Sequence, residues 1–325
     1  MNMGIIGAGS IAKVMARTVA AIPEKAKIHA IASRSLEKAQ AFAKEFNIPN
    51  AYGSYEEMLK NPDIDLIYIA TPHSHHYENM KLCIASKKAV LCEKSFTRNT
   101  KEAEEILKSA EENNVLVTEA IWTRYMPSRK IIAETIASGI IGEVDHLSAN
   151  LHYSIANKER MLKPELAGGA LLDLGVYCLN FATMFFGDDI EKMDSSVALT
   201  DTGVDKFNSM TVFFRNGKIA SLTSGFTNRS DRKGIFHGSK GYAVVENINN
   251  PSSITCYDTN DVELKHIDFP EIATGYEYEV LECGEMLAQN KIQCPSMPHE
   301  ETIFIMKLMD SLRKEWGVKY PGENL

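Results

Sequence analysis

The sequence has few cysteines and no arrangement of them that is typical of a metal site or a disulfide framework. Its six cysteines form no Cys-x-x-Cys pair, and no histidines accompany them at zinc-finger spacing. A secreted disulfide scaffold is usually much shorter than 325 residues and follows a signal segment, whereas this chain opens on an apolar, strand-like run. We therefore expect reduced, buried thiols, no metal, and a cytoplasmic location.

Basic residues are fewer than acidic ones. We also expect no apolar run long enough to cross a bilayer, which takes about 20 residues. The chain has 35 Lys and Arg against 43 Asp and Glu, a formal net charge of -8 at pH 7. Binding to nucleic acid or anionic lipid depends on clustered Lys and Arg. The sequence therefore predicts a small-molecule substrate as partner, with no nucleic acid and no membrane.

The first part of the chain alternates short β-branched apolar runs with amphipathic stretches, as in βαβ units with a parallel sheet. We expect strands at Met3–Ile6, Ile28–Ala32, Leu66–Ala70, Ala89–Cys92 and Val115–Thr118, and helices at Ile11–Ala21, Leu36–Phe46, His76–Ser86 and Thr100–Asn113. Thr100 is the expected N-cap of the last helix. The fold class is therefore α/β, with a doubly wound Rossmann domain over residues 1–120.

Beyond residue 120 strands follow one another without regular helices between them. Examples are Asp145–Tyr153, Met210–Phe214 and Ile219–Ser224, and Asn216-Gly217 predicts a hairpin with a type I′ turn. Helices are expected at Glu277–Gln289 and Glu300–Trp316. The pattern predicts an α+β domain over residues 121–325 with an open, mainly antiparallel sheet, and its C-terminal helix can pack back on the first domain.

A glycine-rich turn, Gly7-Ala8-Gly9-Ser10-Ile11-Ala12, joins the first expected strand to the first helix. Gly7 and Gly9 let the backbone approach a pyrophosphate, and the helix start at Ser10 and Ile11 offers N–H groups and a positive dipole end. Glycine also suits any tight turn, but the strand–turn–helix context favours a nicotinamide dinucleotide.

The end of the second strand bears on which dinucleotide binds. A carboxylate there would accept from the ribose hydroxyls and repel a 2′-phosphate, but the sequence has Ser33-Arg34-Ser35. Arg34 can pair bidentately with a phosphate, and Ser33 and Ser35 can add hydroxyl donors. Glu37 is better explained as a helix-dipole partner. NADP(H) is therefore favoured and NAD(H) stays open.

Three segments resemble the Gfo/Idh/MocA family, named for glucose-fructose oxidoreductase, inositol dehydrogenase and a rhizopine catabolism protein. They are Ala70-Thr71-Pro72-His73-Ser74-His75-His76, Cys92-Glu93-Lys94-Ser95 and Gly168-Gly169-Ala170-Leu171-Leu172-Asp173-Leu174-Gly175-Val176-Tyr177. Within the family, Glu119–Pro127 is most similar to the dimeric dihydrodiol dehydrogenases and NADP-dependent D-xylose 1-dehydrogenases.

The resemblance implies a Rossmann domain followed by an open sheet whose face often mediates dimerisation. It places Lys94 beside substrate and nicotinamide, Asp173 at a catalytic position, and no metal near the histidines. The family's usual proline is Ser95 here, which makes a cis peptide doubtful. Tyr177 stands where histidine is commoner. Cofactor contacts are expected from Thr71, Pro72, His73, His76 and Glu93.

The chemistry implied is hydride transfer with proton transfer to or from a hydroxyl. Tyr177 is a candidate proton carrier because a nearby ammonium such as that of Lys94 lowers the pKa of a phenol, and Lys94 can itself carry the proton. If Gly168–Phe186 is helical, Asp173 lies four residues before Tyr177 and shares its helix face. Trp122 and Arg124 can contact substrate or serve as a core indole and an ion pair. The competing hypothesis is a non-catalytic NAD(P) sensor.

Overall fold

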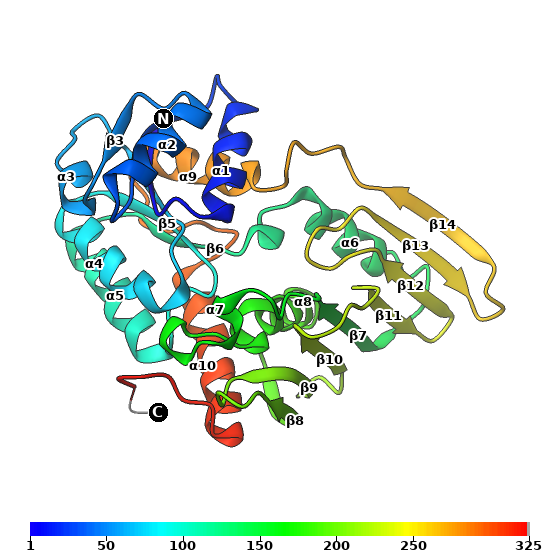
Figure 1. Cartoon of the computed structure of the whole chain (residues 1–325). Coiled ribbons are helices and arrows are strands. Elements are labelled where there is room, and N and C mark those ends of the chain that lie inside the picture. The colour runs from blue at the N-terminus through cyan, green and yellow to red at the C-terminus, as the bar shows by residue number, and fades with distance from the viewer. Residues whose placement is uncertain (324–325) are drawn as a thin grey trace. The chain divides into compact units, whose positions relative to one another are not determined.

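The computed structural model describes residues 1–323, which pack as two units. The first unit comprises Met1–Tyr125 together with Ile272–Met306, and the second comprises Met126–Glu271 together with the chain from Lys307 onward. The predicted division at residue 120 is therefore incomplete, because each unit is made of two separate segments of the chain. The later segment returns to the first unit, where α9 (Glu277–Ala288), drawn in orange, packs beside α1 (Ser10–Ala20) (Figure 1).

The first unit is built on one six-stranded sheet. All neighbouring strands pair in parallel, in the order β3-β2-β1-β4-β5-β6. This is the order of a doubly wound dinucleotide-binding sheet. The strands are β1 (Asn2–Ile6), β2 (Lys27–Ala32), β3 (Asn50–Tyr52), β4 (Leu66–Ile69), β5 (Ala89–Glu93) and β6 (Val117–Ala120). Every residue of β4, β5 and β6 is buried, which explains their continuous apolar runs.

Helices connect these strands, and their starts follow capping chemistry. They are α1, α2 (Leu36–Phe46), α3 (Tyr55–Leu59), α4 (His76–Ala85) and α5 (Thr100–Asn113). The predicted N-cap of α5 is wrong by one residue: the side chain of Asn99 accepts the N–H of Glu102 at 3.0 Å, and Thr100 is the first helical residue. Asparagine is at least as good a cap as threonine, because its carbonyl oxygen accepts the same orphan N–H.

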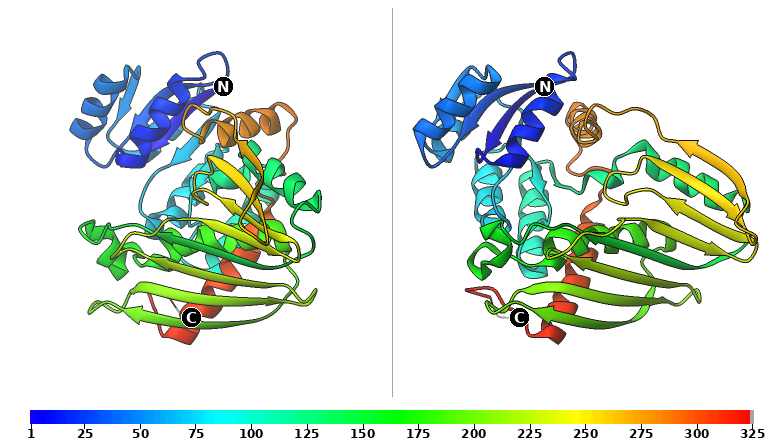
Figure 2. Two further views of the ribbon diagram at one scale, coloured as in Figure 1. Left: turned by 90° about the vertical axis from the view of Figure 1, so that its right-hand side faces the viewer. Right: turned by 45° about the vertical axis from the view of Figure 1, so that its right-hand side comes forward.

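The second unit is built on an eight-stranded sheet in the order β14-β13-β12-β11-β7-β10-β9-β8 (Figure 2). Only β7 and β10 pair in parallel; the other neighbours are antiparallel. The strands are β7 (Val144–His152), β8 (Ile190–Leu199), β9 (Asp205–Phe214), β10 (Ile219–Gly225), β11 (Gly234–Gly238), β12 (Gly241–Val245), β13 (Ser253–Asp258) and β14 (Glu263–Asp268). The predicted open, mainly antiparallel sheet is confirmed.

The hairpin between β9 and β10 is present, but its predicted turn type is wrong. Gly217 has a φ of 82°, whereas Asn216 is not among the residues with positive φ. A type I′ turn needs both. Here the N–H of Gly217 donates to the carbonyl of Phe214 at 2.9 Å, and the N–H of Phe214 donates to Lys218 at 2.9 Å. A three-residue connection therefore replaces the two-residue turn.

Helices cover one face of the second sheet. The main one is α8 (Val176–Phe186), which packs on β7 and β10, and it follows a π-helical turn at Leu171–Gly175. The other α-helices within residues 1–323 are α6 (Pro127–Ala137), α7 (Glu159–Leu162) and α10 (His299–Trp316), and α10 has residues in both units. Along β7, β9 and β10 residues of intermediate exposure alternate with buried ones, so the residues of intermediate exposure share the face of the sheet opposite the buried ones.

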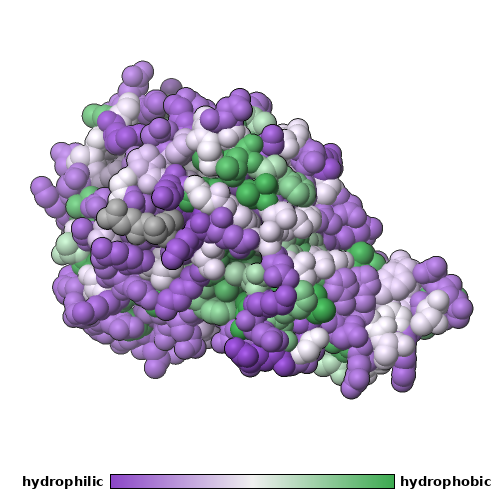
Figure 3. Space-filling model, turned by 90° about the horizontal axis from the view of Figure 1, so that it is seen from below, coloured by the Kyte–Doolittle hydropathy of each residue, from purple (hydrophilic) through white to green (hydrophobic). Residues whose placement is uncertain are grey.

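One expectation about membranes needs correction. Pro164–Phe186 is, by length and composition, apolar enough to cross a bilayer, although 89% of its most apolar 18-residue window is buried inside the protein. The apolar character is that of a core segment, because the helix lies against the sheet. The molecular face in Figure 3 is mostly hydrophilic, with smaller groups of hydrophobic residues near its middle. All six cysteines are free and buried, as predicted.

Candidate active site

The glycine turn after β1 leaves the start of α1 open. Gly7 has a φ of 99°, and a Cβ built there would lie 3.0 Å from the carbonyl oxygen of Ala70. Gly9 is the N-cap of α1; it gives no side-chain hydrogen bond, and the first turn holds no acid. By contrast Ser35 caps α2 and Asn99 caps α5. The amides of α1 at Ser10 and Ile11 are thus suited to a phosphate group, and the turn fits a dinucleotide.

The segment after β2 presents a cation. Arg34 is exposed, and within residues 1–323 no hydrogen bond or ion pair of its side chain is found. Ser33 is half-buried, and its hydroxyl accepts the N–H of Ser35 at 3.4 Å. The Ser35 hydroxyl caps α2 by accepting from Lys38 at 3.3 Å, so it is already engaged. Arg34 and Ser33 therefore stay suited to a phosphate, and Ser35 does not add a free hydroxyl.

His76 joins the loops that follow β4 and β5. Its side chain is fully buried, with Nε2 2.8 Å from the carbonyl oxygen of Thr71 and Nδ1 2.9 Å from that of Ser95. Burial lowers the pKa of His76 to about 4. The hydrogen bonds to these carbonyls raise the pKa, but burial has the larger effect. Thr71, Pro72 and the buried His73 lie on the same loop. His76 therefore holds the loop through its ring, whereas a contact of its own with the cofactor stays a prediction.

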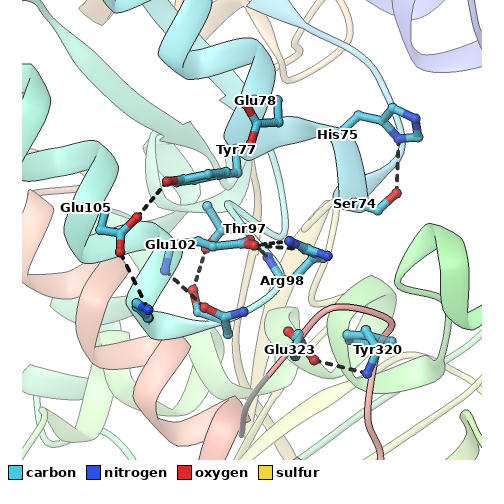
Figure 4. Close-up of polar contacts among 12 residues, drawn as sticks. Ser74, His75, Tyr77, Glu78, Thr97, Arg98, Glu102, Glu105, Tyr320 and Glu323 are labelled. Atoms are coloured by element: carbon cyan, nitrogen blue, oxygen red, sulfur yellow. Dashed lines mark hydrogen bonds and ion pairs between the residues drawn. The ribbon is translucent and has the colours of Figure 1, made fainter.

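Polar contacts also fasten the loop between β5 and α5 (Figure 4). Arg98 forms an ion pair with Glu102 of α5, with Nε 2.9 Å from the carboxylate. The hydroxyl of Thr97 donates to the carbonyl of Asn99 at 2.8 Å. On the neighbouring helix, Tyr77 donates to Glu105 at 2.6 Å, which ties α4 to α5. The backbone after Lys94 is therefore held by its own helix.

Lys94 directly follows β5, at the carboxyl edge of the sheet, and is half-buried. The preceding carboxylate, Glu93, accepts the hydroxyl of Tyr68 and, at 3.3 Å, the N–H of Lys94. The doubt about a cis peptide is wrong: Lys94–Ser95 is cis although proline is absent. Hydrogen bonds flank this peptide, because the Ser95 carbonyl meets His76 and the Phe96 N–H meets Glu119.

Trp122 and Arg124 both have partners within the first unit. The indole stacks on Tyr276 with ring centroids 4.0 Å apart and an interplanar angle of 12°. Arg124 is 4% exposed and forms an ion pair with Glu301 of α10. Both side chains thus serve packing and charge pairing here, and their contact with substrate stays a prediction.

In the second unit, Asp173 and Tyr177 stand at the start of a buried helix. Asp173 lies in the π-helical turn, and its two carboxylate oxygens accept from Nη1 and Nη2 of Arg160 at 2.9 and 3.1 Å. Tyr177 is in the first turn of α8, and each of the two residues is 5% exposed. The predicted helix is present from Leu171, with a π turn that sequence periodicity does not reveal. Such turns often occur at functional sites.

Several buried acids have no role predicted from the sequence. In the first unit these are Glu119 and Glu279; in the second, Asp205. Neither carboxylate oxygen of Glu279 has a hydrogen-bond partner within the described chain, and burial followed by the charge of Glu93 raises its pKa well above the usual range. Their sequence neighbours resemble ordinary strand and helix positions, so only the burial marks them. Among residues 1–323 no cluster of three His, Cys, Asp or Glu is arranged to hold a metal.

The parallel sheet, its glycine turn and the lysine at its carboxyl edge define a dinucleotide-binding Rossmann protein with a reactive side chain beside the ligand position. Comparison with known families agrees. The profile described as "Oxidoreductase family, NAD-binding Rossmann fold" matches residues 1–121, and the GFO/IDH/MocA C-terminal domain matches residues 130–244. The chain belongs to the GFO/IDH/MocA family, which confirms the predicted fold and an NAD(P)-dependent oxidoreductase.

Relatives of known activity match the whole chain. Trans-1,2-dihydrobenzene-1,2-diol dehydrogenase of Mus musculus is 32% identical over 333 residues, covering 99% of both chains. The enzyme of the same name from Xenopus tropicalis is 33% identical, covering 98% of both. The predicted resemblance to the dihydrodiol dehydrogenase branch is thus confirmed.

Solved structures share the fold. KijD10, a 3-ketoreductase from Actinomadura kijaniata in complex with NADP and TDP-benzene, has a TM-score of 0.87 at 23% identity and 97% coverage of both chains. Aldose-aldose oxidoreductase from Caulobacter crescentus has a TM-score of 0.86 at 18% identity, covering 98% of this chain and 97% of that one.

Proposed function

We propose that the protein is an NADP-dependent dehydrogenase or reductase that acts on a CH–OH group of a sugar or cyclic diol, or on a small carbonyl compound. One observation carries the proposal: Lys94 leaves β5 at the carboxyl edge of the same sheet whose β1 ends in the phosphate-binding turn. Ligands of such sheets bind at that edge. The relatives named above act on a diol, a ketone and aldoses, which supports the substrate class.

Proton transfer is assigned to Lys94 and Tyr177. The nicotinamide, when bound, supplies or accepts the hydride. As an ammonium, Lys94 donates a hydrogen bond to the substrate oxygen and stabilises negative charge there. In oxidation Tyr177, as the phenolate, would take the proton of the substrate hydroxyl and become the neutral phenol, and in reduction the phenol would return that proton. Asp173, held by Arg160, fixes the turn that carries Tyr177.

NADP is the proposed dinucleotide because the sheet offers a cation and no carboxylate after β2. Arg34 is exposed directly beyond the strand, and Glu37 is exposed on the first turn of α2. A guanidinium pairs well with a phosphate, whereas an acid at the strand end would repel it. The NADP complex of KijD10 supports the same choice.

The decisive experiment measures NADP⁺ reduction over a panel of sugars and cyclic diols, together with NADPH oxidation over carbonyl compounds. We expect turnover by the wild-type protein and a loss of at least about 10³-fold in kcat for Lys94→Ala, in the range of a general acid or base. NADPH binding, followed by fluorescence, should change little. Lys101→Ala is the matched control, because Lys101 is 86% exposed on α5.

Two outcomes contradict the proposal. Full turnover by Lys94→Ala would remove the lysine from the chemistry. Tight NADPH binding by the wild type without turnover on any substrate would favour the non-catalytic sensor.

We further propose a cytoplasmic homodimer that associates through the open face of the second sheet. Along β7, β9 and β10, this face carries half-exposed residues such as His146, Thr211 and Ser221. The rings of His146 and His237 stack there with centroids 4.7 Å apart. Half-exposed side chains of this kind suit burial by a second copy.

The cytoplasmic location is supported by the six free thiols, which suit a reducing compartment. Cell fractionation tests whether the protein is found in the cytoplasm.

A further inference from the structure

Glu119 is an acid that the proposed chemistry does not yet use, although it lies beside Lys94. The strands β5 and β6 pair in parallel, with Cys92 opposite Glu119 and Glu93 opposite Ala120. Lys94 is the next residue after β5, so both strands end at the same edge of the sheet. The side chain of Glu119 is enclosed there, since the residue is 1% exposed.

The carboxylate of Glu119 anchors the chain that follows Lys94. Its Oε1 accepts the N–H of Phe96 at 3.1 Å. The main-chain oxygen of Glu119 accepts the hydroxyl of Tyr125 at 2.9 Å, which fixes the end of β6. The other carboxylate oxygen, Oε2, is buried and has no partner at ordinary hydrogen-bond distance within the described residues, although the Thr302 side chain acts on this carboxyl as a donor. Glu119 thus holds the Lys94 segment with one oxygen.

Cations face this carboxylate from two elements. Lys94 approaches from the end of β5 and Arg124 from the segment Trp122–Arg124; Thr302 of α10 faces it from a third side. Arg124 is itself paired with Glu301. Burial raises the pKa of Glu119 to about 7, while the Phe96 N–H, Thr302, Arg124 and Lys94 lower it. The carboxyl therefore changes charge near neutral pH.

A purely structural acid at this position is hard to justify. A glutamine would accept the same Phe96 N–H through its carbonyl oxygen and would avoid burying an ionisable group. An unpaired buried polar oxygen costs about 1–3 kcal/mol of stability. Keeping a carboxylate here is reasonable where its negative charge has a target, and the basic side chains whose charges act on it are Arg124, already paired with Glu301, and Lys94.

We propose that Glu119 is a positioning residue for Lys94, which fixes the Lys94–Phe96 segment by hydrogen bonding and orients the Lys94 side chain by its negative charge. The inference rests on the proposed function of Lys94. The hydrogen bond and the charge are separable, because Glu119→Gln keeps the acceptor for Phe96 and removes only the charge.

The kinetic test compares wild type with Glu119→Gln between pH 6 and 9. At pH 8, where Glu119 is an anion, we expect kcat/KM for substrate to fall about tenfold, which corresponds to ~1.4 kcal/mol. At pH 6 the two proteins should converge, because the wild-type carboxyl is then protonated. The affinity for NADPH should stay within about twofold, as expected for an effect on Lys94 alone. Glu112→Gln, 62% exposed on α5, is the control.

A second measurement does not depend on activity. Lysines are labelled as ¹³C-dimethylamines, and the Lys94 signal is assigned as the one missing from Lys94→Arg. In the wild type we expect this signal to show a titration step near pH 7 that reports Glu119, and in Glu119→Gln we expect the step to vanish.

These outcomes separate the two proposals. If the substrate panel shows no turnover, the proposed function fails, while the Lys94 titration still tests the coupling. A Lys94 signal without a step near pH 7 in the wild type overturns the role of Glu119, even if Glu119→Gln does not fold. The role of Glu119 is also overturned if kcat/KM depends on pH in the same way in the wild type and in Glu119→Gln.

Discussion

At the scale of single residues, Arg34 determines the predicted choice of dinucleotide. Its exposed guanidinium follows β2 directly, where the 2′-phosphate of NADP is expected. Hydrogen bonds to a charged group contribute about 1.5–3 kcal/mol, so Arg34→Ala should weaken NADP⁺ binding by about 10- to 100-fold. Binding of NAD⁺, which lacks this phosphate, should change by less than about twofold.

Isothermal titration with both dinucleotides measures the effect of Arg34→Ala. Lys38→Ala is the control, because Lys38 is also an exposed cation and lies on α2. This variant should leave the ratio of NADP⁺ affinity to NAD⁺ affinity unchanged. Equal losses for NADP⁺ and NAD⁺ in Arg34→Ala would contradict a phosphate contact.

Residues differ in how far sequence alone could place them. Gly7 and Lys94 were predictable because the turn and the Glu93-Lys94 motif carry local signatures. Arg160, Glu119 and Glu301 were not, because each depends on a partner distant in sequence, such as Asp173 for Arg160 or Arg124 for Glu301. Local patterns do not encode which charged residues meet when strands and helices assemble.

At the scale of elements, Asp205 links the start of β9 to the turn before α8. Its Oδ2 accepts the N–H of Leu171 at 2.7 Å and the amide of Asn208 at 2.9 Å. A Cβ on Gly169, where φ is 117°, would lie 2.2 Å from Oδ1 of Asp205, so this approach requires glycine. Burial raises the pKa of Asp205 to about 7 from 3.8, although its hydrogen bonds and Arg313 lower it.

The raised pKa gives the stability of the protein a definite pH dependence. The folded state holds the Asp205 proton more tightly than the unfolded state, so this contribution is complete below pH 3.8 and is lost as pH rises through about 7. Asp205→Asn keeps an acceptor for Leu171 and cannot ionise. Relative to wild type, the variant should gain roughly 2 kcal/mol of unfolding free energy between pH 5 and pH 8.

Urea unfolding at both pH values tests this expectation. Asp201→Asn, exposed in the loop before β9, is the matched control and should show the wild-type pH dependence. An unchanged difference between pH 5 and pH 8 in Asp205→Asn would show that Asp205 does not titrate in this range.

The elements themselves were largely predictable where periodicity is strong. The five expected strands and four expected helices of the first unit are present, with ends shifted by no more than two residues. The short β3 and α3 were missed, since three and five residues are too few to show a period. The π-helical turn before Tyr177 was also missed, because its backbone geometry leaves the apolar pattern of a buried helix unchanged.

At the scale of the whole molecule, the open sheet face predicts a stable homodimer. Light scattering coupled to size exclusion should give twice the 36.2 kDa of one chain. Thr211→Arg, at a half-exposed position in the middle of β9, should yield monomers because it places unpaired charge in the interface. Gln40→Arg, at an exposed position on α2 of the first unit, adds the same charge away from this sheet and is the control. A wild-type monomer at micromolar concentration would contradict the proposal.

The fold class and both sheet types could be predicted from the sequence, because alternating and helical periods report local burial. The division of the chain could not, since a domain that is discontinuous in sequence leaves no compositional boundary. Ile272–Met306 contributes α9, Tyr276 and Glu301 to the first unit, and these supply partners for Trp122 and Arg124.

The return of that segment has a consequence for synthesis of the protein. A ribosome makes the six-stranded sheet within the first 125 residues, but the segment that completes this unit ends at Met306. Tyr276 and Glu301, which contact Trp122 and Arg124, are therefore synthesised only after most of the chain has been made. During translation, the unit begun first is among the last parts of the molecule to be finished.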